Sequence, residues 1–252
     1  MNAEIISIGT ELLLGHILNT NTAFLSQKLA ETGIDVYNTS VVGDNPRRLV
    51  ESLKEALNRS DIVITTGGLG PTVDDITRDA LAAALGKKPV LDRPTVAVMT
   101  ERYAVRGRKM NPAGERQALV FEGATVLPNS VGAAPGQRLE LPGGKLLFVL
   151  PGPPNEFNAI LNEEIIPWLK ERFPDARPRP VRIIRTQGIG ESDIVTILER
   201  ENFQPLDVDL GFYPAMGKVE IRLTADPAHE AQVSEAEQTL LGLLADFIDP
   251  ES

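Results

Sequence analysis

Short apolar runs alternate with segments of helical spacing along the first 170 positions. The runs at 5–8, 62–64 and 145–149 are typical of strands in a buried sheet, and the segment 36–42, which begins and ends with valine, is the next predicted strand. The segments at 22–32, 46–57, 76–85 and 157–169 carry apolar residues three and four positions apart, which predicts amphipathic helices. Strands and helices in alternation predict an α/β fold with a mostly parallel sheet.

A second, smaller module is predicted after a stiff stretch at 174–180, which contains three prolines. Beyond it the pattern predicts strands at 181–186, 207–212 and 219–224, a helix at 193–201, and a long final helix that includes Val233 and Phe247. We therefore expect a domain at 1–173, a linker at 174–180 and a β-α-β-β-α module at 181–252.

Polar loops follow the predicted strands of the first domain. Parallel sheets bind ligands beyond the carboxyl ends of their strands, so we expect these loops to converge on one edge. The loops at 9–11, 43–45, 65–75 and 150–156 are the ones concerned. Their candidate ligand-binding residues are Gly9, Thr10, Glu11, Thr66, Gly67, Gly68, Gly70, Pro71, Thr72, Pro151 and Gly152.

The loop at 65–75 joins a glycine-rich turn to two carboxylates, Asp74 and Asp75, at a strand-to-helix junction. Glycines let the backbone approach a ligand, and the first N–H groups of a helix favour an anion, which predicts a phosphate site. A side chain at Gly68 would then occupy the space of the phosphate. A divalent cation, most simply Mg²⁺, would reconcile the carboxylates with that phosphate.

A purely structural interpretation of the same loop stays open. Two glycines after a strand often form only a turn, and Asp74 would then cap the following helix. The loop is neither a Walker loop, because no Gly-Lys-Ser/Thr follows, nor a Gly-x-Gly-x-x-Gly dinucleotide motif.

The composition of the chain excludes several kinds of site and disfavours several kinds of binding partner. The chain has no cysteine, which excludes disulfides and zinc-thiolate sites, and its two histidines, His16 and His229, lie far apart in sequence. A net charge of −10 disfavours nucleic acid and anionic membranes, and no apolar run approaches the length of a bilayer span. We expect a cytoplasmic protein whose partner is a small molecule, with no nucleic acid and no membrane.

A basic stretch at 102–109 contains Arg102, Arg106, Arg108 and Lys109. Such a cluster either closes over a phosphate, of its own subunit or of a neighbour, or forms a solvated helix face. The sequence leaves both interpretations open, and Arg116 and Gln117 share the ambiguity.

Five segments together resemble the N-terminal part of the CinA family, the competence/damage-inducible proteins, and more distantly the MoaB/MogA molybdopterin-binding domains. They are residues 8–15, 19–21, 42–45, 65–75 and 150–153, and Gly188-Ile189-Gly190-Glu191-Ser192 extends the resemblance into the second module. The resemblance implies a three-layer α/β domain, a KH-like module and a homodimer. The module lacks the Gly-x-x-Gly loop of RNA-binding KH domains.

The resemblance also implies an activity, the metal-dependent hydrolysis of ADP-ribose or a related nucleotide substrate to AMP and ribose 5-phosphate. Asp44 and Asp75 would bind the metal or orient the water, and Asn19 and Asn21 would contact the substrate. CinA proteins carry a separate nicotinamide mononucleotide deamidase domain, so the sequence is expected to be a fragment or a stand-alone relative. The alternatives are a molybdopterin- or nucleotide-binding module without hydrolysis, and an inactive interaction scaffold.

Overall fold

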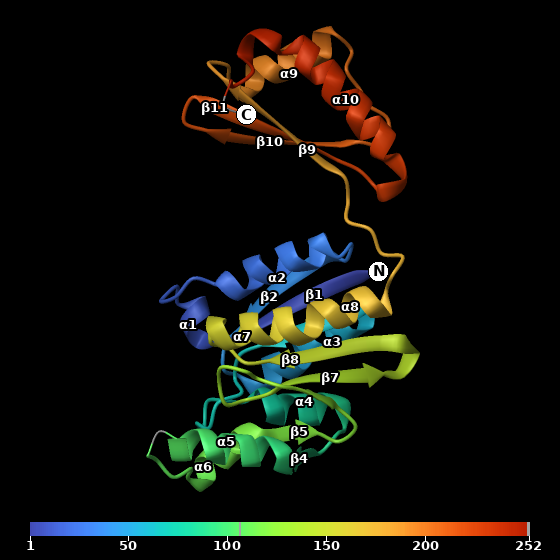
Figure 1. Ribbon diagram of the computed structural model, residues 1–252. Coiled ribbons are helices and arrows are strands. Elements are labelled where there is room, and N and C mark those ends of the chain that lie inside the picture. The colour runs from blue at the N-terminus through green and yellow to red at the C-terminus, as the bar shows by residue number, and fades with distance from the viewer. Residues whose placement is uncertain (106, 251–252) are drawn as a thin grey trace. The chain divides into compact units, whose positions relative to one another are not determined.

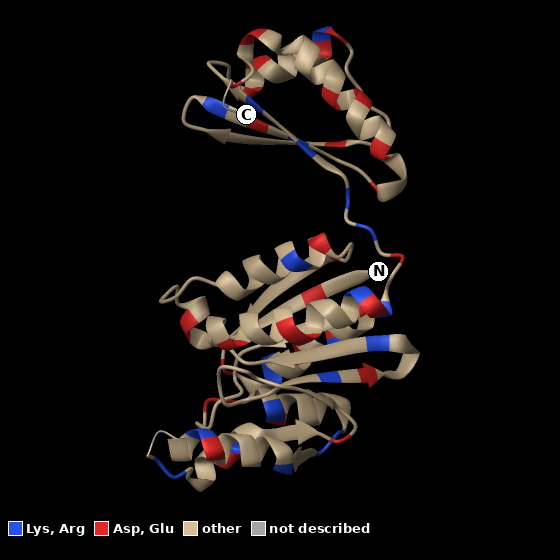
Figure 2. Cartoon of the chain, in the orientation of Figure 1, with Lys and Arg blue, Asp and Glu red and all other residues tan. Residues whose placement is uncertain are grey.

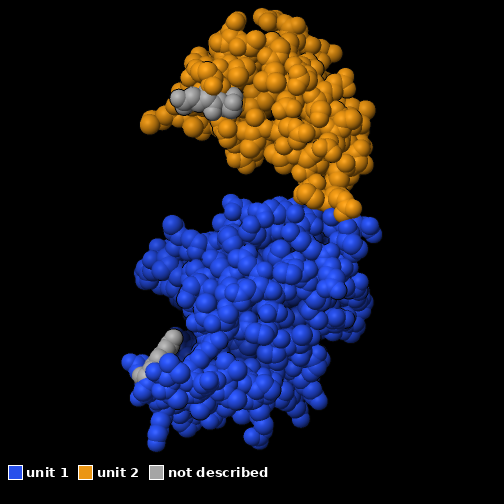
Figure 3. All heavy atoms as spheres, viewed as in Figure 1, with its two compact units in different colours: residues 1–176 blue, residues 177–252 orange. Residues whose placement is uncertain are grey.

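The computed structural model describes residues 1–105 and 107–250 and divides the chain into two compact units (Figure 1). The first comprises residues 1–176 and the second residues 177–252, as coloured in Figure 3. The boundary between them falls inside the proline-rich stretch at 174–180. Within the described residues, no helix combines the length and the apolar character that a membrane span requires.

A six-stranded sheet forms the centre of the first unit, in the order β2-β1-β3-β8-β7-β6. The first four of these strands run parallel, and β7 pairs antiparallel with both β8 and β6, which confirms the predicted mostly parallel sheet. The strands are β1 (Asn2–Ile8), β2 (Asp35–Val42), β3 (Ile62–Thr66), β6 (Thr125–Leu127), β7 (Gly136–Leu141) and β8 (Lys145–Leu150).

Helices cover both faces of this sheet and give the three layers that Figure 1 shows. One face carries α2 (Thr20–Glu31), α7 (Pro154–Ile160) and α8 (Ile166–Arg172), with the π-helical turn η3 (Leu161–Ile165) between the last two. The other face carries α3 (Pro46–Arg59) and α4 (Thr77–Leu85). Neighbouring residues of β1 therefore enter opposite cores, Ile5 on the first face and Ile6 on the second. This two-sided burial explains the continuous apolar runs of the strands.

Local hydrogen bonds set the starts of two helices. The side chain of Asn19 accepts a hydrogen bond from the N–H of Thr22 at the start of α2, and Asn45 accepts one from Arg48 at the start of α3. Pro46 stands at the first position of α3, where a missing N–H carries no cost.

A small insertion lies between α4 and β6. Its two short strands, β4 (Pro89–Leu91) and β5 (Leu119–Phe121), pair antiparallel and flank α5 (Arg93–Val105) and α6 (Pro112–Glu115). Short helical turns complete the unit: α1 (Thr10–Leu13), η1 (Arg116–Ala118) and η2 (Pro142–Gly144).

The second unit has the predicted β-α-β-β-α order, with an antiparallel sheet arranged β10-β11-β9. Its elements are β9 (Val181–Gln187), α9 (Glu191–Arg200), β10 (Asp209–Ala215), β11 (Lys218–Thr224), η4 (Pro227–His229), α10 (Glu230–Leu243) and η5 (Ala245–Phe247). The predicted strand at 207–212 begins two residues late, because Asp207 has a φ of 57° and so lies in a left-handed turn.

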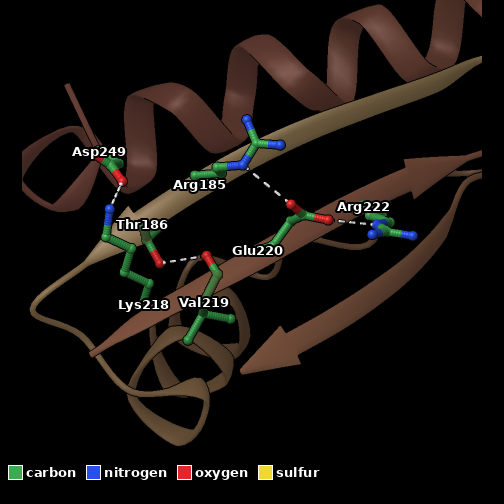
Figure 4. A network of polar contacts seen from close by, with 7 residues as sticks. All are labelled: Arg185, Thr186, Lys218, Val219, Glu220, Arg222 and Asp249. Carbon is green, nitrogen blue, oxygen red and sulfur yellow. Dashed lines mark hydrogen bonds and ion pairs between the residues drawn. The ribbon is translucent and has the colours of Figure 1, made fainter. Parts of the chain in front are cut away.

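Polar contacts join the strands of this small sheet (Figure 4). Glu220 of β11 accepts hydrogen bonds from Arg222 at 2.6 Å and from Arg185 of β9 at 3.2 Å. These contacts, the bond from Arg222 first, lower the pKa of Glu220. The C-terminal segment is tied to the same sheet, since Asp249 pairs with Lys218 and its N–H donates to the carbonyl of Arg185.

Candidate functional site

A cavity of about 380 Å³ opens at the carboxyl ends of β1, β3 and β8 in the first unit. It lies at the edge where the sequence predicts a ligand site. The predicted site residues in its wall are Glu11, Asn19, Asn21, Thr66, Gly67, Gly68, Gly70, Asp75, Pro151 and Gly152. The wall does not include Gly9, Thr10, Asp44, Pro71, Thr72 or Asp74.

The loop after β3 is held from behind by the first two residues of α4, Thr77 and Arg78. The Thr77 Oγ1 donates to the carbonyl of Gly67, at 2.8 Å, and the Thr77 N–H donates to the carbonyl of Gly68. The Arg78 guanidinium donates to the next two carbonyls, those of Leu69 at 2.8 Å and Gly70. Four successive carbonyl groups are thus satisfied on the helix side of the loop.

The N–H groups of the same loop have different partners. Gly67 donates to the carbonyl of Leu150, whereas Gly70 and Thr72 donate to the carboxylate of Asp75. In the described part of the chain, the N–H groups of Gly68 and Leu69 have no hydrogen-bond partner, and both residues line the cavity. These two N–H groups are therefore the ones available to a phosphate.

Asp75 organises the loop. Its Oδ1 accepts from the Gly70 N–H at 2.7 Å, and its Oδ2 accepts from the Thr72 N–H at 2.8 Å and from the Thr72 hydroxyl. The expectation that Gly70 and Thr72 hold a phosphate through their N–H groups is therefore wrong for this structure, because the chain's own carboxylate occupies them. Pro71, which lies between them, has no N–H to offer.

Asp74 is exposed and does not line the cavity. A hydrogen bond from Thr72, followed by one from its own backbone, lowers the pKa of Asp74. The alternative role of Asp74 as a helix cap is wrong, since α4 begins at Thr77 and no side chain caps it.

Close packing explains two of the glycines. A side chain at Gly68, whose φ is 66°, would meet the hydroxyl of Thr77. The expectation that it would fill the phosphate space is therefore wrong. At Gly152 an added Cβ would lie 3.3 Å from the Cα of Gly67, so the loops after β3 and β8 touch through their backbones.

Asp44 pairs with the loop after β1 and does not line the cavity. Its Oδ2 accepts from the N–H of Thr10 at 2.9 Å, and its own N–H donates to the Thr10 hydroxyl at 3.0 Å. This reciprocal pair fixes the segment that carries Glu11 into the cavity wall. The structure thus places Asp44 behind the site, and its role as a metal ligand stays a prediction.

The two asparagines of the cavity wall, Asn19 and Asn21, differ in which side-chain atoms remain free to bind a ligand. Asn19 is the cap of α2 and also donates from its Nδ2 to the hydroxyl of Ser7 at 3.0 Å. Asn21 is 8% exposed and donates from its Nδ2 to the Thr66 hydroxyl at 3.1 Å and to the Gly152 carbonyl at 2.8 Å. The Asn21 Oδ1 has no partner among the described residues. A buried acceptor of this kind favours a ligand that carries a hydrogen-bond donor.

Several wall residues were not predicted from the sequence, namely Ser7, Ile8, Leu12, Ile17, Leu18, Thr20, Leu69, Ala134, Pro153, Pro154 and Glu156. Gln117, which the sequence left ambiguous, also lines the cavity. The sequence analysis also missed Arg78, which lies directly behind the loop. The feature that could have indicated it is a charged residue in the largely apolar segment that follows the glycines.

The basic stretch at 102–109 does not enter the cavity wall in the described residues. Arg102 donates to the carbonyls of Asn129, Ser130 and Gly132 and so fixes that loop. Arg106 lies outside the described residues. Arg102 thus has a structural role within its own chain.

The overall charge of the chain does not by itself favour an anion. Its net charge is −10, and Figure 2 shows Lys and Arg interspersed with Asp and Glu along both units. Attraction for a phosphate must therefore come from local groups: the free N–H groups of the loop, the start of α4, and the nearby guanidinium groups of Arg78 and Arg116.

The described residues contain no group of three or more His, Cys, Asp or Glu side chains arranged to hold a metal ion. Mg²⁺ does not require such a group, because it is commonly bound by one or two carboxylates together with substrate phosphates. Glu11 and Asp75 supply carboxylates in the wall of the cavity that also presents the free N–H groups of the loop. The residues present therefore fit a metal that is shared with a phosphorylated ligand.

Comparisons with known proteins agree on both units. Residues 4–171 match the family of the probable molybdopterin binding domain, and residues 181–246 match the damage-inducible protein CinA KH domain. A crystal structure of CinA of unknown function from Thermoplasma acidophilum is 34% identical, with a TM-score of 0.60, over 66% of this chain and 97% of that chain.

Longer relatives match nearly the whole chain. The putative competence-damage inducible protein of Levilactobacillus brevis is 43% identical over 92% of this chain and 56% of its own length. The protein of the same description from Symbiobacterium thermophilum is also 43% identical, over 92% of this chain and 55% of its own length. The chain thus spans little more than half the length of these relatives.

Proposed function

Because this chain belongs to the CinA family, with a molybdopterin-binding-type domain followed by a CinA KH domain, we propose that its cavity binds and hydrolyses a nucleoside diphosphate sugar. ADP-ribose is the proposed substrate, and AMP and ribose 5-phosphate are the products. The observation that carries the proposal is the pair of N–H groups at Gly68 and Leu69 that have no partner in the described residues, in a cavity wall that also contains the carboxylates of Glu11 and Asp75.

The loop after β3 forms the phosphate end of the proposed site. Its carbonyl groups are engaged by Thr77 and Arg78, so the N–H groups of Gly68 and Leu69 are left to bind phosphate oxygens. The first turn of α4, which holds this loop from behind through Thr77 and Arg78, adds the positive end of a helix dipole on that side of the loop.

Other residues of the cavity wall suit the nucleoside part of the ligand. The buried Oδ1 of Asn21 offers an acceptor to a sugar hydroxyl or a base amino group. Leu12, Ile17 and Leu18 add apolar surface to the wall, and Leu18 is 85% exposed. Burial of such surface under a base is favourable.

Hydrolysis adds the oxygen of water to one phosphorus and breaks the bridging P–O bond of the pyrophosphate. Glu11 and Asp75 would hold a divalent metal, which when bound offsets phosphate charge and lowers the pKa of a coordinated water. Asp75 also keeps the loop in shape, whereas the Glu11 carboxylate accepts no hydrogen bond in the described part of the chain. We therefore assign the proton of the attacking water to Glu11.

The test is a product assay on the purified chain. ADP-ribose is incubated with Mg²⁺, with Mn²⁺ or with a chelator, and AMP and ribose 5-phosphate are separated by chromatography. We expect both products in equal amounts with metal and neither with the chelator. Absence of AMP with every metal would refute the hydrolase.

A second candidate function is binding without hydrolysis. It is favoured by the match of residues 4–171 to a probable molybdopterin binding domain and by the lack of a three-ligand metal cluster in the described residues. Measuring ADP-ribose binding by calorimetry and AMP release on the same protein distinguishes the two functions, because a binding module would bind ADP-ribose without releasing AMP.

A further inference from the structure

Arg78, which lies behind the loop after β3, is an unusual residue for a buried position. It is only 3% exposed, yet in the described part of the chain it forms no ion pair. Its guanidinium donates instead to two neutral carbonyl groups, those of Leu69 and Gly70. A buried cation is costly unless its charge is compensated.

The charged groups around Arg78 do not offset its burial, since its pKa is lowered. Desolvation is the largest cause; Asp75 and Asp79 raise the pKa, whereas the neighbouring cation Arg116 lowers it. Asp75 in turn accepts hydrogen bonds from the Gly70 and Thr72 N–H groups. An anion bound at the loop would offset part of the remaining cost of burying the Arg78 cation.

We propose that Arg78 is the positioning residue of the phosphate site: without touching the ligand, it anchors the Leu69 and Gly70 carbonyls and so keeps in place the loop whose Gly68 and Leu69 N–H groups, directed by Thr77, would bind a phosphate. The inference rests on the proposed function, since it concerns the same cavity. A planar guanidinium suits this role, because its forked N–H groups hold two adjacent carbonyls at once. Lysine offers a single point of charge and cannot reproduce the fork.

The geometry explains why the loop faces the cavity in one way only. Each peptide unit carries its N–H and its carbonyl on opposite sides, so fixing the carbonyl of Gly67 through Thr77 directs the N–H of Gly68 away from the helix. The carbonyl of Gly68, which accepts from the Thr77 N–H, does the same for the N–H of Leu69. Arg78 secures the next two carbonyls and prevents this segment from turning over.

The experiment measures binding by calorimetry with three probes: inorganic pyrophosphate, ADP-ribose and adenosine, all in the presence of Mg²⁺. The variants are Arg78→Met, Arg78→Lys and the control Arg47→Met, which alters an arginine whose side chain is 82% exposed on α3. Circular dichroism establishes that each variant is folded. If Arg78→Met is unfolded, Arg78→Lys carries the test.

We expect Arg78→Met to weaken pyrophosphate and ADP-ribose binding by about ten- to a hundredfold, the range of charged hydrogen bonds, and to leave adenosine binding unchanged. The affinity of Arg78→Lys for both phosphorylated probes should lie between those of Arg78→Met and the wild type, and Arg47→Met should bind them as tightly as the wild type. A purely structural role would weaken adenosine as much as the phosphates, and that result overturns the inference.

The inference also fails if folded Arg78→Met, or Arg78→Lys in its absence, binds pyrophosphate as tightly as the wild type does. Failure of the wild type to bind either phosphorylated probe would instead refute the proposed function, and the inference with it. The two failures are therefore distinguishable.

Discussion

Substitution of Asp75 by asparagine tests the loop and the chemistry together. The Asp75 carboxylate accepts hydrogen bonds from two backbone N–H groups, at 2.7 Å from Gly70 and 2.8 Å from Thr72. An asparagine has one acceptor oxygen, so its NH₂ group must face one of these N–H donors. The half-buried Gly70 should keep the oxygen, since Thr72 is exposed and its N–H can turn to water.

The size of the effect follows from those two contacts. One charge-assisted hydrogen bond, worth about 1.5–3 kcal/mol, is lost to solvent, and the other becomes a neutral bond of about 0.5–1.5 kcal/mol. Water recovers part of the loss at Thr72. We expect Asp75→Asn to lower the free energy of unfolding by about 1–3 kcal/mol, which leaves most domains of this size folded.

Activity should fall much further than stability in Asp75→Asn, because the same change removes a carboxylate from the proposed metal site. We expect urea denaturation to show a folded variant and chromatography to show no AMP formed with Mg²⁺. The matched control is Thr72→Val, which deletes the hydroxyl that bonds to Asp75 but keeps the Asp75 carboxylate; it should cost about 0.5–1.5 kcal/mol with AMP release retained. Undiminished turnover by Asp75→Asn would refute the role of this carboxylate in the reaction.

Three further outcomes are expected. Gly68→Val should destabilise the first unit through contact with Thr77 and an unfavourable left-handed φ, and a thermal midpoint equal to the wild type would contradict this. Glu11→Gln should bind ADP-ribose in calorimetry but release AMP at least about a hundredfold more slowly, within the usual range for a lost general base; wild-type turnover would exclude it as the proton acceptor. The hydrogen bond from Arg222 lowers the pKa of Glu220 in the folded protein. Glu220 therefore stabilises the folded state above its unfolded pKa of about 4.3, and this stabilisation is lost as the pH falls through the lower, folded pKa. Denaturation of the second unit at pH 7 and at pH 3 should therefore show a smaller difference for Glu220→Gln than for the wild type, and equal differences would argue against the contact.

The sequence predicted the layers of the first unit well, because burial leaves a direct mark on residue type. Strand β1 is apolar on both sides since Ile5 and Ile6 face different cores, and α3 shows its buried stripe at Leu49 and Leu53. The antiparallel strand β7 was not predicted, because its register depends on pairing with β8 and not on its own pattern. The left-handed turn at Asp207 likewise leaves no periodic signal.

The location of the candidate site was predictable, but its internal hydrogen bonding was not. Glycines after a strand indicate a loop that approaches something closely, and they do not specify whether that is a ligand or another part of the chain. At Gly68 the neighbour is Thr77, and at Gly152 it is the backbone of Gly67. The acidic residues have the same ambiguity, since a carboxylate serves equally as a metal ligand or as an acceptor for loop N–H groups. Only the folded arrangement shows that Asp75 accepts hydrogen bonds from the Gly70 and Thr72 N–H groups.

The cavity wall contains both carboxylates and free N–H groups, and together they indicate which kind of ligand it suits. Glu11, Asp75 and Glu156 give the wall three carboxylates, and Glu156 is engaged by the side chain of Asn129. The free N–H groups of Gly68 and Leu69 lie in the same wall and favour an anion. A monoanion would gain from the loop and lose to the carboxylates, whereas a diphosphate can place one phosphate at the loop and share a cation between the other and the carboxylates. The cavity thus suits a pyrophosphate with a bound metal better than either component alone, so metal and ligand should each raise the affinity of the other.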